Sequence, residues 1–389
     1  MKTSLNFFDE VVSTKEVIFF CGPGGVGKTT TAAAMAVKLA SEYDKNVLVL
    51  TIDPAKRLAN ALGVQNLGNN VNKVESAEFL NNSIEPKGTL YAAMLDTKKS
   101  WDDLIKRHAP DDKVAQTILK NPLYHNITAK FVQSHEYIAM ERLYELHTSA
   151  QYDIILVDTP PTRNALDFLD APERMADFFS SRLLRWLITP YRSRLVNLAS
   201  RPFYQLADKV LGGQFLQDIA DFFILFQSMY DGFIERAKAV SHLLTDQRCG
   251  FVVVTTLEQV PFAESKFFLE EINKRNMHLL AVVMNKVLPD LLRSKENLEV
   301  ARELESQKEK IGEFLSGKIG TELSICSAVL SETAQSFLNF NKVALIEASL
   351  EKELKNQAFS SLKAFYSRFE PVTIKDLKDL ADQFVVTNK

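Results

Sequence analysis

Eight residues near the N-terminus, Gly22 to Thr29, read GPGGVGKT and follow the pattern G-x-x-x-x-G-K-[ST]. A short apolar run, EVIFFC over 16–21, precedes them, and an alanine-rich run, TTTAAAMAVKLA over 29–40, follows them. The first run predicts a buried strand, and the second predicts a helix. A strand before the pattern and a helix after it are the context that this pattern requires. The chain is therefore predicted to hold a glycine-rich loop, a P-loop, between a central strand and a helix.

This loop predicts a phosphate site. Glycines adopt backbone angles that other residues avoid, so consecutive N–H groups are able to converge on phosphate oxygens. The N-terminus of the following helix adds partial positive charge. Lys28 is expected to reach the β- and γ-phosphates, and the Thr29 hydroxyl is expected to ligate Mg²⁺. ATP and Mg²⁺ are the predicted cofactors, and the predicted nucleotide contacts of the loop are Gly24, Gly25, Val26, Gly27, Lys28, Thr29 and Thr30. The alternative is a glycine-rich turn that binds no ligand.

Short apolar runs predict a sheet. They are rich in β-branched residues and lie between helical stretches, at 46–52, 88–96, 153–157, 250–255, 278–284 and, for a possible final strand, 322–326. Buried strands that alternate with helices predict a parallel sheet covered on both faces. The predicted fold class is α/β: a parallel-sheet P-loop nucleotide-binding core with helices on both faces and an embedded helical subdomain.

Two long stretches lack strand character. Residues 98–150 and 163–247 have helical periodicity, and we expect them to be insertions that form the helical subdomain. A helix is predicted at about 293–315, and the chain after 326 is predicted to be helical to about 369. Because no repeat or low-complexity linker divides the sequence, a single ATPase domain over 1–389 is the expected organisation.

Two aspartates follow predicted strands and are candidates for the chemistry. Asp158 ends the run DIILVD, which places it at the carboxyl edge of the sheet, where α/β proteins bind ligands. It is the predicted second metal residue beside Thr29. Asp53, in Asp-Pro-Ala, is a candidate to orient or deprotonate the attacking water. The simpler interpretations are a turn aspartate for Asp158 and a helix N-cap for Asp53.

Composition excludes several classes of protein. A net charge of −3 and a pI of about 6.1 argue against a general nucleic-acid binder, which carries a basic excess. The three cysteines, Cys21, Cys249 and Cys326, are isolated and form no C-x-x-C pair, which fits a reducing compartment. No signal peptide is recognisable, and no apolar run approaches the roughly 18 residues of a membrane span. We therefore expect a cytoplasmic protein without an integral membrane segment.

Three motifs in order resemble a known family. The P-loop GGVGKTT, then Asp53-Pro54-Ala55, then DTPPT over 158–162, are similar to those of the arsenite-transport and tail-anchored-protein-targeting ATPases. This resemblance implies a dimer, with Asp53 in a first switch and Asp158 in a second. It also implies that Asn285, in VMNK, reads the adenine edge. An amide at a strand end is able to donate and accept together, although Asn285 is also explained as a polar strand-end residue.

The sequence departs from this family in several places. The family usually has a lysine that reaches the partner's nucleotide where this chain has Pro23, and the zinc-binding C-x-x-C and the arsenite-binding cysteines are absent. Either another basic residue replaces the missing lysine, or a lysine-bearing relative forms a heterodimer with this chain. Among the basic residues of the switches, Lys56, Arg57 and Arg163, the catalytic candidate is Arg163; a surface arginine is the alternative.

The second insertion carries an apolar seam with helical spacing, formed by Phe215, Ile219, Phe222, Phe226, Met229 and Phe233. In the resembling family such an insertion makes a groove for a client's hydrophobic helix. Periodic apolar residues more often form the core of their own subdomain, and both interpretations stay open.

The predicted function is a Mg²⁺-dependent ATPase that acts as a dimeric nucleotide-driven switch on a hydrophobic protein segment or a membrane-associated partner. The alternatives are a metabolic enzyme that phosphorylates a small carboxylate and a positioning ATPase at a membrane surface or on DNA. A metabolic enzyme needs a compact polar substrate pocket, and the insertions are mostly apolar. A positioning ATPase usually has a terminal amphipathic helix or a basic patch, and the tail over 370–389 is only weakly amphipathic.

Overall fold

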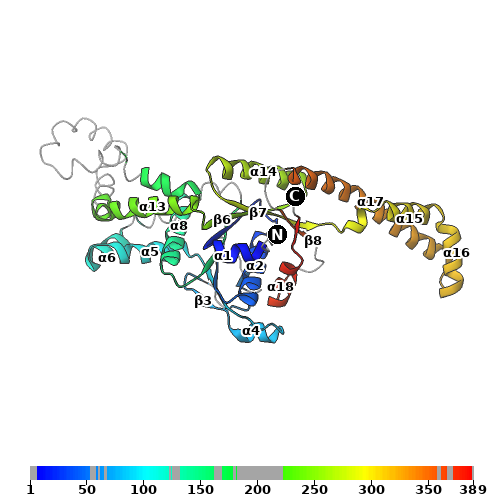
Figure 1. Cartoon of the computed structure of the whole chain (residues 1–389), viewed down its shortest axis with the longest axis horizontal. Coiled ribbons are helices and arrows are strands. Elements are labelled where there is room, and N and C mark those ends of the chain that lie inside the picture. The colour runs from blue at the N-terminus through cyan, green and yellow to red at the C-terminus, as the bar shows by residue number, and fades with distance from the viewer. Residues whose placement is uncertain are drawn as a thin grey trace, which may run out of the picture.

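The computed structural model describes residues 7–52, 58–59, 62–64, 68–121, 124, 132–161, 169–177, 181, 222–356, 361–365 and 371–387. Within these ranges the chain builds one large sheet, flanked by helices and extended at both ends by helical regions (Figure 1). The sheet strands are β1 (Val17–Cys21), β2 (Asn46–Thr51), β3 (Asn72–Lys73), β4 (Thr89–Met94), β5 (Ile154–Asp158), β6 (Cys249–Thr256), β7 (Leu279–Val287), β8 (Ser361–Phe365) and β9 (Val385–Thr387).

The strand order is β3-β4-β2-β5-β1-β6-β7-β8-β9. The seven strands from β4 to β8 pair in parallel, while β3 and β9 close the two edges in antiparallel pairing. Parallel neighbours have their carboxyl ends at the same edge, so β1, β2, β5 and β7 all end there. This arrangement confirms the predicted α/β class with a mostly parallel sheet.

Side-chain alternation along the central strands forms a core on each face of the sheet. On one face, residues such as Ile18 and Phe20 pack against α1 (Phe7–Thr14), α2 (Lys28–Glu42) and α18 (Ile374–Asp382). On the other face, Val17 and Phe19 belong to a core shared with α8 (Val132–Thr148), α13 (Tyr230–Thr245) and α14 (Gln259–Lys274). Because both faces are covered, the central strands are apolar throughout instead of alternating with polar residues.

A third core holds the helical region that extends from one end of the sheet (Figure 1). It joins α5 (Thr97–His108), α6 (Asp112–Lys120), α8 and α13 around large side chains such as Trp101 and Tyr137. The first of these helices ends just before Pro110, since α5 ends at His108 and α6 begins at Asp112. Of the apolar seam, Phe222, Phe226, Met229 and Phe233 are buried in this core, while Phe215 and Ile219 lie outside the described residues.

At the other end of the sheet, an arm of helices projects away from the core (Figure 1). It comprises η2 (Asp290–Arg293), α15 (Lys295–Ser306), α16 (Lys308–Ile319) and the 33-residue α17 (Leu323–Lys355). The predicted single helix over 293–315 is therefore two helices, and the predicted strand over 322–326 is wrong. Glu322 is the N-cap of α17 and the other four residues form its first turn, where Cys326 packs inward and continues the helical spacing of the buried positions Ala334 and Asn341.

The C-terminal prediction also requires correction. The chain was expected to stay helical to about 369, but α17 ends at Lys355 and β8 then adds a parallel strand beside β7. The tail that looked only weakly amphipathic forms α18, in which Ile374, Leu377 and Leu380 are buried. A helix that packs on α2 and a strand at the sheet edge bind the C-terminal segment to the nucleotide-binding core. The described elements also include α4 (Ser76–Asn81), between β3 and β4 in the chain, and η1 (Gln227–Met229), just before α13.

Candidate nucleotide site

The loop between β1 and α2 has the backbone shape that its glycines predict. Gly22, Gly25 and Gly27 have φ angles of 148°, 77° and 96°, a region that side-chain-bearing residues rarely adopt. Space is also limiting at Gly22, because an added Cβ would lie 2.1 Å from the Val254 carbonyl oxygen. At these positions a larger residue would distort the loop, so the glycines are required by geometry as well as by the motif.

Lys28 and Thr29 begin α2 at the mouth of this loop. The Lys28 ammonium donates to the Pro23 carbonyl oxygen at 2.9 Å, and the Lys28 side chain is mostly buried. The Thr29 hydroxyl donates to Oδ2 of Asp158 at 2.6 Å. This bond joins two residues that are 129 positions apart in the sequence, at the start of α2 and at the end of β5.

Asp158 is held at the carboxyl edge by a second hydroxyl. Thr51, the last residue of β2, donates to the same Oδ2 at 3.0 Å. The next residue, Thr159, donates through its hydroxyl to the Phe20 carbonyl oxygen at 2.8 Å, which fixes the chain after β5 against β1. Asp158 is only 1% exposed, so its carboxylate has one well-defined position beside the P-loop.

The oxygens of Thr29 and Asp158 fit a magnesium ion. Mg²⁺ prefers hard oxygen ligands and is usually bound by one or two protein oxygens together with phosphates and water. A threonine hydroxyl and a carboxylate in direct contact at the first turn of the P-loop helix are such a donor pair. Bound there, the ion would neutralise charge on the nucleotide phosphates, and Thr29 and Asp158 are the residues that would hold it.

Asn285 lies against the P-loop from the β7 side. Its amide donates to the Val26 carbonyl oxygen at 2.8 Å, and its Oδ1 accepts the Lys286 backbone N–H at 2.9 Å. A Cβ at Gly27 would come within 2.3 Å of the same amide nitrogen. Asn285 therefore links β7 to the loop directly, while its role at the adenine edge stays a prediction.

Lys286 is a basic residue that the sequence interpretation did not assign. Its ammonium lies 3.4 Å from the Gly25 carbonyl oxygen, so a second lysine joins Lys28 at the P-loop. The sequence did not predict this contact. Side chains alternate between the two faces of a strand, so residue 286 would be expected to point into the core. The adjacent Asn285 was the only signal in the sequence.

Only some of the remaining predicted site residues lie in the described part of the chain. Gly24, Gly25 and Val26 lie in the described loop, with Val26 buried and the two glycines exposed, and Thr30 lies in the first turn of α2. Asp53 and Arg163 lie outside the described residues, as do Lys56 and Arg57. Their predicted roles in the switches stay predictions.

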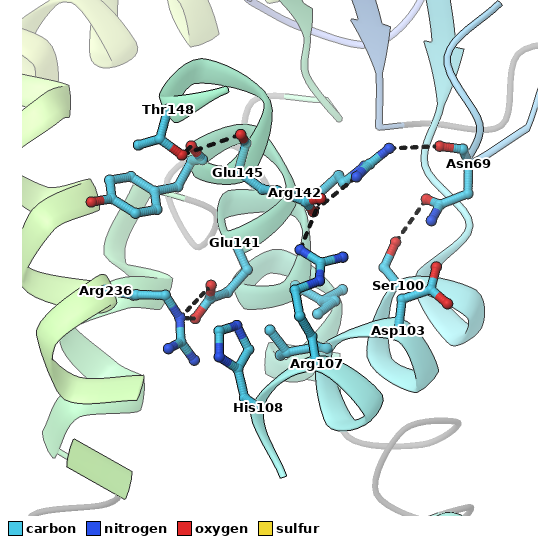
Figure 2. Close-up of a pocket in the computed structure, with 13 residues that line it drawn as sticks. Asn69, Ser100, Asp103, Arg107, His108, Glu141, Arg142, Glu145, Thr148 and Arg236 are labelled. Atoms are coloured by element: carbon cyan, nitrogen blue, oxygen red, sulfur yellow. Dashed lines mark hydrogen bonds and ion pairs between the residues drawn. The ribbon is translucent and has the colours of Figure 1, made fainter. Parts of the chain in front are cut away.

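A second group of polar side chains lines a pocket between α5, α8 and α13 (Figure 2). Its arginines pair with carboxylates: Arg236 donates through Nε to both oxygens of Glu141 at 3.0 and 2.9 Å, and Arg107 and Arg142 each contact Glu145 at 2.8 Å. Burial raises the pKa of Glu141, although Arg236 opposes this effect. The positive charges of this pocket are balanced by its own acids.

The three cysteines are buried and free. Burial raises the pKa of Cys21 to about 12 and that of Cys249 further. No group of three or more His, Cys, Asp or Glu suited to a metal occurs in the described ranges.

A P-loop at the carboxyl edge of a mostly parallel sheet, with a threonine–aspartate pair beside it, defines a P-loop nucleoside-triphosphatase. The sequence matches the family described as anion-transporting ATPase over residues 15–327. The chain belongs to this family, and it is an ATP hydrolase.

Individual relatives share about a quarter of their residues with the chain. A protein named as an arsenical pump-driving ATPase in Aquifex aeolicus is 27% identical over 70% of this chain and 81% of its own length. The ATPase ASNA1 homolog of Plasmodium yoelii yoelii is 26% identical over 79% and 71%. The ATPase GET3 of Malassezia globosa is 26% identical over 70% and 72%.

Proposed function

We propose that this protein is a Mg²⁺-dependent ATPase whose nucleotide cycle drives a dimeric switch that binds a hydrophobic protein segment or a membrane-associated partner. In this proposal residues 98–150 and 163–247 form a helical subdomain of the single domain over 1–389. Lys28 binds the phosphates, Thr29 and Asp158 hold Mg²⁺, and Asp53 activates water.

One observation carries this proposal: a single helix, α8, packs in both the helical region and the sheet core and leads into β5, the strand that ends at Asp158. α8 contributes Tyr137 and Ile138 to the core of the helical region, and further along it contributes Leu143 and Leu146 to the sheet core. A short connection then leads into β5, which ends at Asp158. A change in the position of Asp158 would therefore be transmitted through β5 and α8 to the region that carries the apolar seam.

The dimer is part of the proposal for a chemical reason. Pro23 has no charge, so a cation for the developing phosphate charge must come from elsewhere in the chain or from a partner. A second copy of the chain and a lysine-bearing relative are the two partners that this reasoning allows. The protein acts away from nucleic acid in this proposal, as its acidic balance favours. No helix in the described ranges is long and apolar enough to cross a membrane.

The metabolic alternative has less support in the described pocket. A phosphotransferase for small carboxylates needs cations that are available to bind the substrate carboxylate. The arginines of the pocket in Figure 2 already pair with Glu141 and Glu145. The seam residues that a client would contact, such as Phe226 and Phe233, are instead buried and would need a conformational change to be exposed.

Hydrogen exchange over 222–245 tests the switch. A ligand shifts a conformational equilibrium only through different affinity for the two states, so protection of this segment should differ between ADP and a non-hydrolysable ATP analogue. The Lys28→Ala protein is the control, and its exchange should not respond to either nucleotide. Identical protection of the parent protein in both nucleotide states would show that the seam is permanent core.

A further inference from the structure

Lys286 has an unusual backbone conformation. Four described residues other than glycine have positive φ angles: Ser83, Ala150, Asn276 and Lys286. The first three lie in turns just after helices, where this conformation is common. Lys286, at φ 56°, lies inside β7. Left-handed backbone at a residue with a side chain costs free energy and persists where the surroundings enforce it, often at functional sites.

A β-bulge produces this conformation and turns the lysine out of the core. In the pairing of β7 with β8, Met284 is opposite Lys363 and Val287 is opposite Phe365, so β7 has one extra residue between these pairs. Met284 and Val287 both point into the same core, three positions apart instead of two. Without the bulge, residue 286 would share the buried face of Met284. The bulge therefore places an exposed lysine where a regular strand would require an apolar residue.

The released side chain extends to the P-loop. The Lys286 ammonium contacts the Gly25 carbonyl oxygen at 3.4 Å, while the Lys28 ammonium contacts the Pro23 carbonyl oxygen at 2.9 Å. Both acceptors are neutral carbonyl groups of one loop. A phosphate oxygen carries negative charge and is a stronger acceptor for an ammonium group. Lys286 thus brings a second ammonium group, beside that of Lys28, to the loop that is predicted to bind the phosphates.

We propose that Lys286 supplies the terminal phosphates of ATP with the positive charge that Pro23 does not provide. The inference rests on ATP hydrolysis at this P-loop. When water attacks the γ-phosphorus, its proton passes to Asp53, the base of the proposed function, while the bond to the bridging oxygen breaks and ADP leaves with the electron pair. Lys286 takes no proton in this step and stabilises the charge on the phosphate oxygens. Asn285, which holds both the loop and the Lys286 backbone N–H, positions the lysine.

Three variants at position 286 distinguish the effect of the lysine charge on turnover from the effect of its backbone conformation on stability. Lys286→Gln should lower kcat by at least about ten-fold, since cations that act on the transferred phosphate contribute orders of magnitude. Lys286→Arg should keep most of the activity because it keeps the charge. Lys286→Gly should lose as much turnover as Lys286→Gln while unfolding at an equal or higher denaturant concentration, because glycine adopts positive φ without strain.

Nucleotide binding gives a second measurement that is independent of turnover. Titration of Lys286→Gln should show weaker binding of a non-hydrolysable ATP analogue than the parent, and unchanged binding of ADP. A lysine that only shaped the loop would change both affinities together and would lower the stability of the Lys286→Gln protein. Either of those results, or a Lys286→Gln protein as active as the parent, would overturn the proposal.

The variants also distinguish this inference from its competitors. Arg163→Ala is the matched comparison, because Arg163 was the candidate taken from the sequence. If Arg163→Ala lowers turnover while Lys286→Gln does not, the cation comes from the second switch and Lys286 is excluded. A parent protein that binds no ATP would instead refute the nucleotide site itself, and Lys28→Ala, which should bind none, provides that reference.

Discussion

Charged side chains gather both at the P-loop edge of the sheet and in the pocket between α5, α8 and α13. The two regions differ in the groups that these side chains contact. At the P-loop, Lys28 and Lys286 contact neutral carbonyl oxygens. In the helical pocket, Arg236 is paired with the buried carboxylate of Glu141 (Figure 2). An ammonium group on a carbonyl is able to move to a phosphate with a net gain, whereas an arginine in a buried ion pair would leave an uncompensated acid behind.

This difference predicts different roles for the two regions. The first region is arranged to receive a negatively charged ligand, and its residues should control turnover. The second region is neutral within itself, and its residues should control stability. Substitutions at the P-loop edge should therefore change turnover, and substitutions in the helical pocket should change stability. A pocket substitution that changes only turnover would contradict this assignment.

Lys28→Ala should have the largest effect on activity. It removes a cation that faces the β- and γ-phosphates, and charge-assisted contacts of this kind are about twice as strong as neutral ones. We expect no measurable ATP hydrolysis and a loss of nucleotide binding by calorimetry. The denaturant midpoint should stay close to that of the parent, because the Lys28 ammonium contacts a carbonyl of its own loop, that of Pro23. A variant that unfolds early would show that Lys28 is mainly structural.

Asp53→Asn should have the next largest effect, confined to the chemical step. If Asp53 activates the attacking water, its loss should lower kcat by about 10²–10⁴-fold, the usual contribution of a general base. Binding of ADP and of an ATP analogue should remain as in the parent. Single-turnover kinetics with titrated nucleotide measures both quantities on one preparation, and equal turnover of the two proteins would remove Asp53 from the mechanism.

The parts of the fold that the sequence predicted well are those set by local pattern. Buried strands such as 153–157 and the helix after the P-loop follow directly from apolar runs and alanine content. The pairing of Thr29 with Asp158 was predictable because parallel strands end at one edge. These features depend on rules that act over a few residues or on the topology of parallel sheets in general.

The errors have a different origin. Residues 322–326 look like a strand by composition, but their partners are α16 and not the sheet: Gly312 allows the helices to approach so closely that a Cβ there would meet Ser327 at 2.6 Å. Residues 361–365 form β8 because β7 offers an open edge. Such assignments depend on tertiary contacts that override local propensity.

The contact of Lys286 with the P-loop could not be predicted for a related reason. A bulge is a register shift between two paired strands. It depends on how the strands pair, which the sequence of one strand alone does not predict. Positive φ at a lysine is also contrary to its propensity. The motif in the sequence indicated Asn285, and the structure shows that the next residue, Lys286, also contacts the P-loop.

Glu141→Gln tests the helical pocket and should have the smallest effect on chemistry. Glu141 is 5% exposed, accepts two hydrogen bonds from Arg236 and accepts another from Tyr137. Removing one member of a buried ion pair leaves the other uncompensated and typically costs about 3–5 kcal/mol. Because Arg236 keeps some solvent contact, with 18% of its side chain exposed, we expect the lower end, about 3 kcal/mol, in urea unfolding.

Glu145→Gln is the matched control on the same helix. Glu145 also contacts two arginines, but its side chain is 37% exposed, and exposed pairs contribute about 0–1 kcal/mol. The same chemical change four positions further along α8 should therefore cost little. Both variants should keep the kcat of the parent, since neither acid reaches the P-loop edge. If Glu141→Gln instead lowers kcat with unchanged stability, the helical pocket takes part in the nucleotide cycle and the separation of the two regions fails.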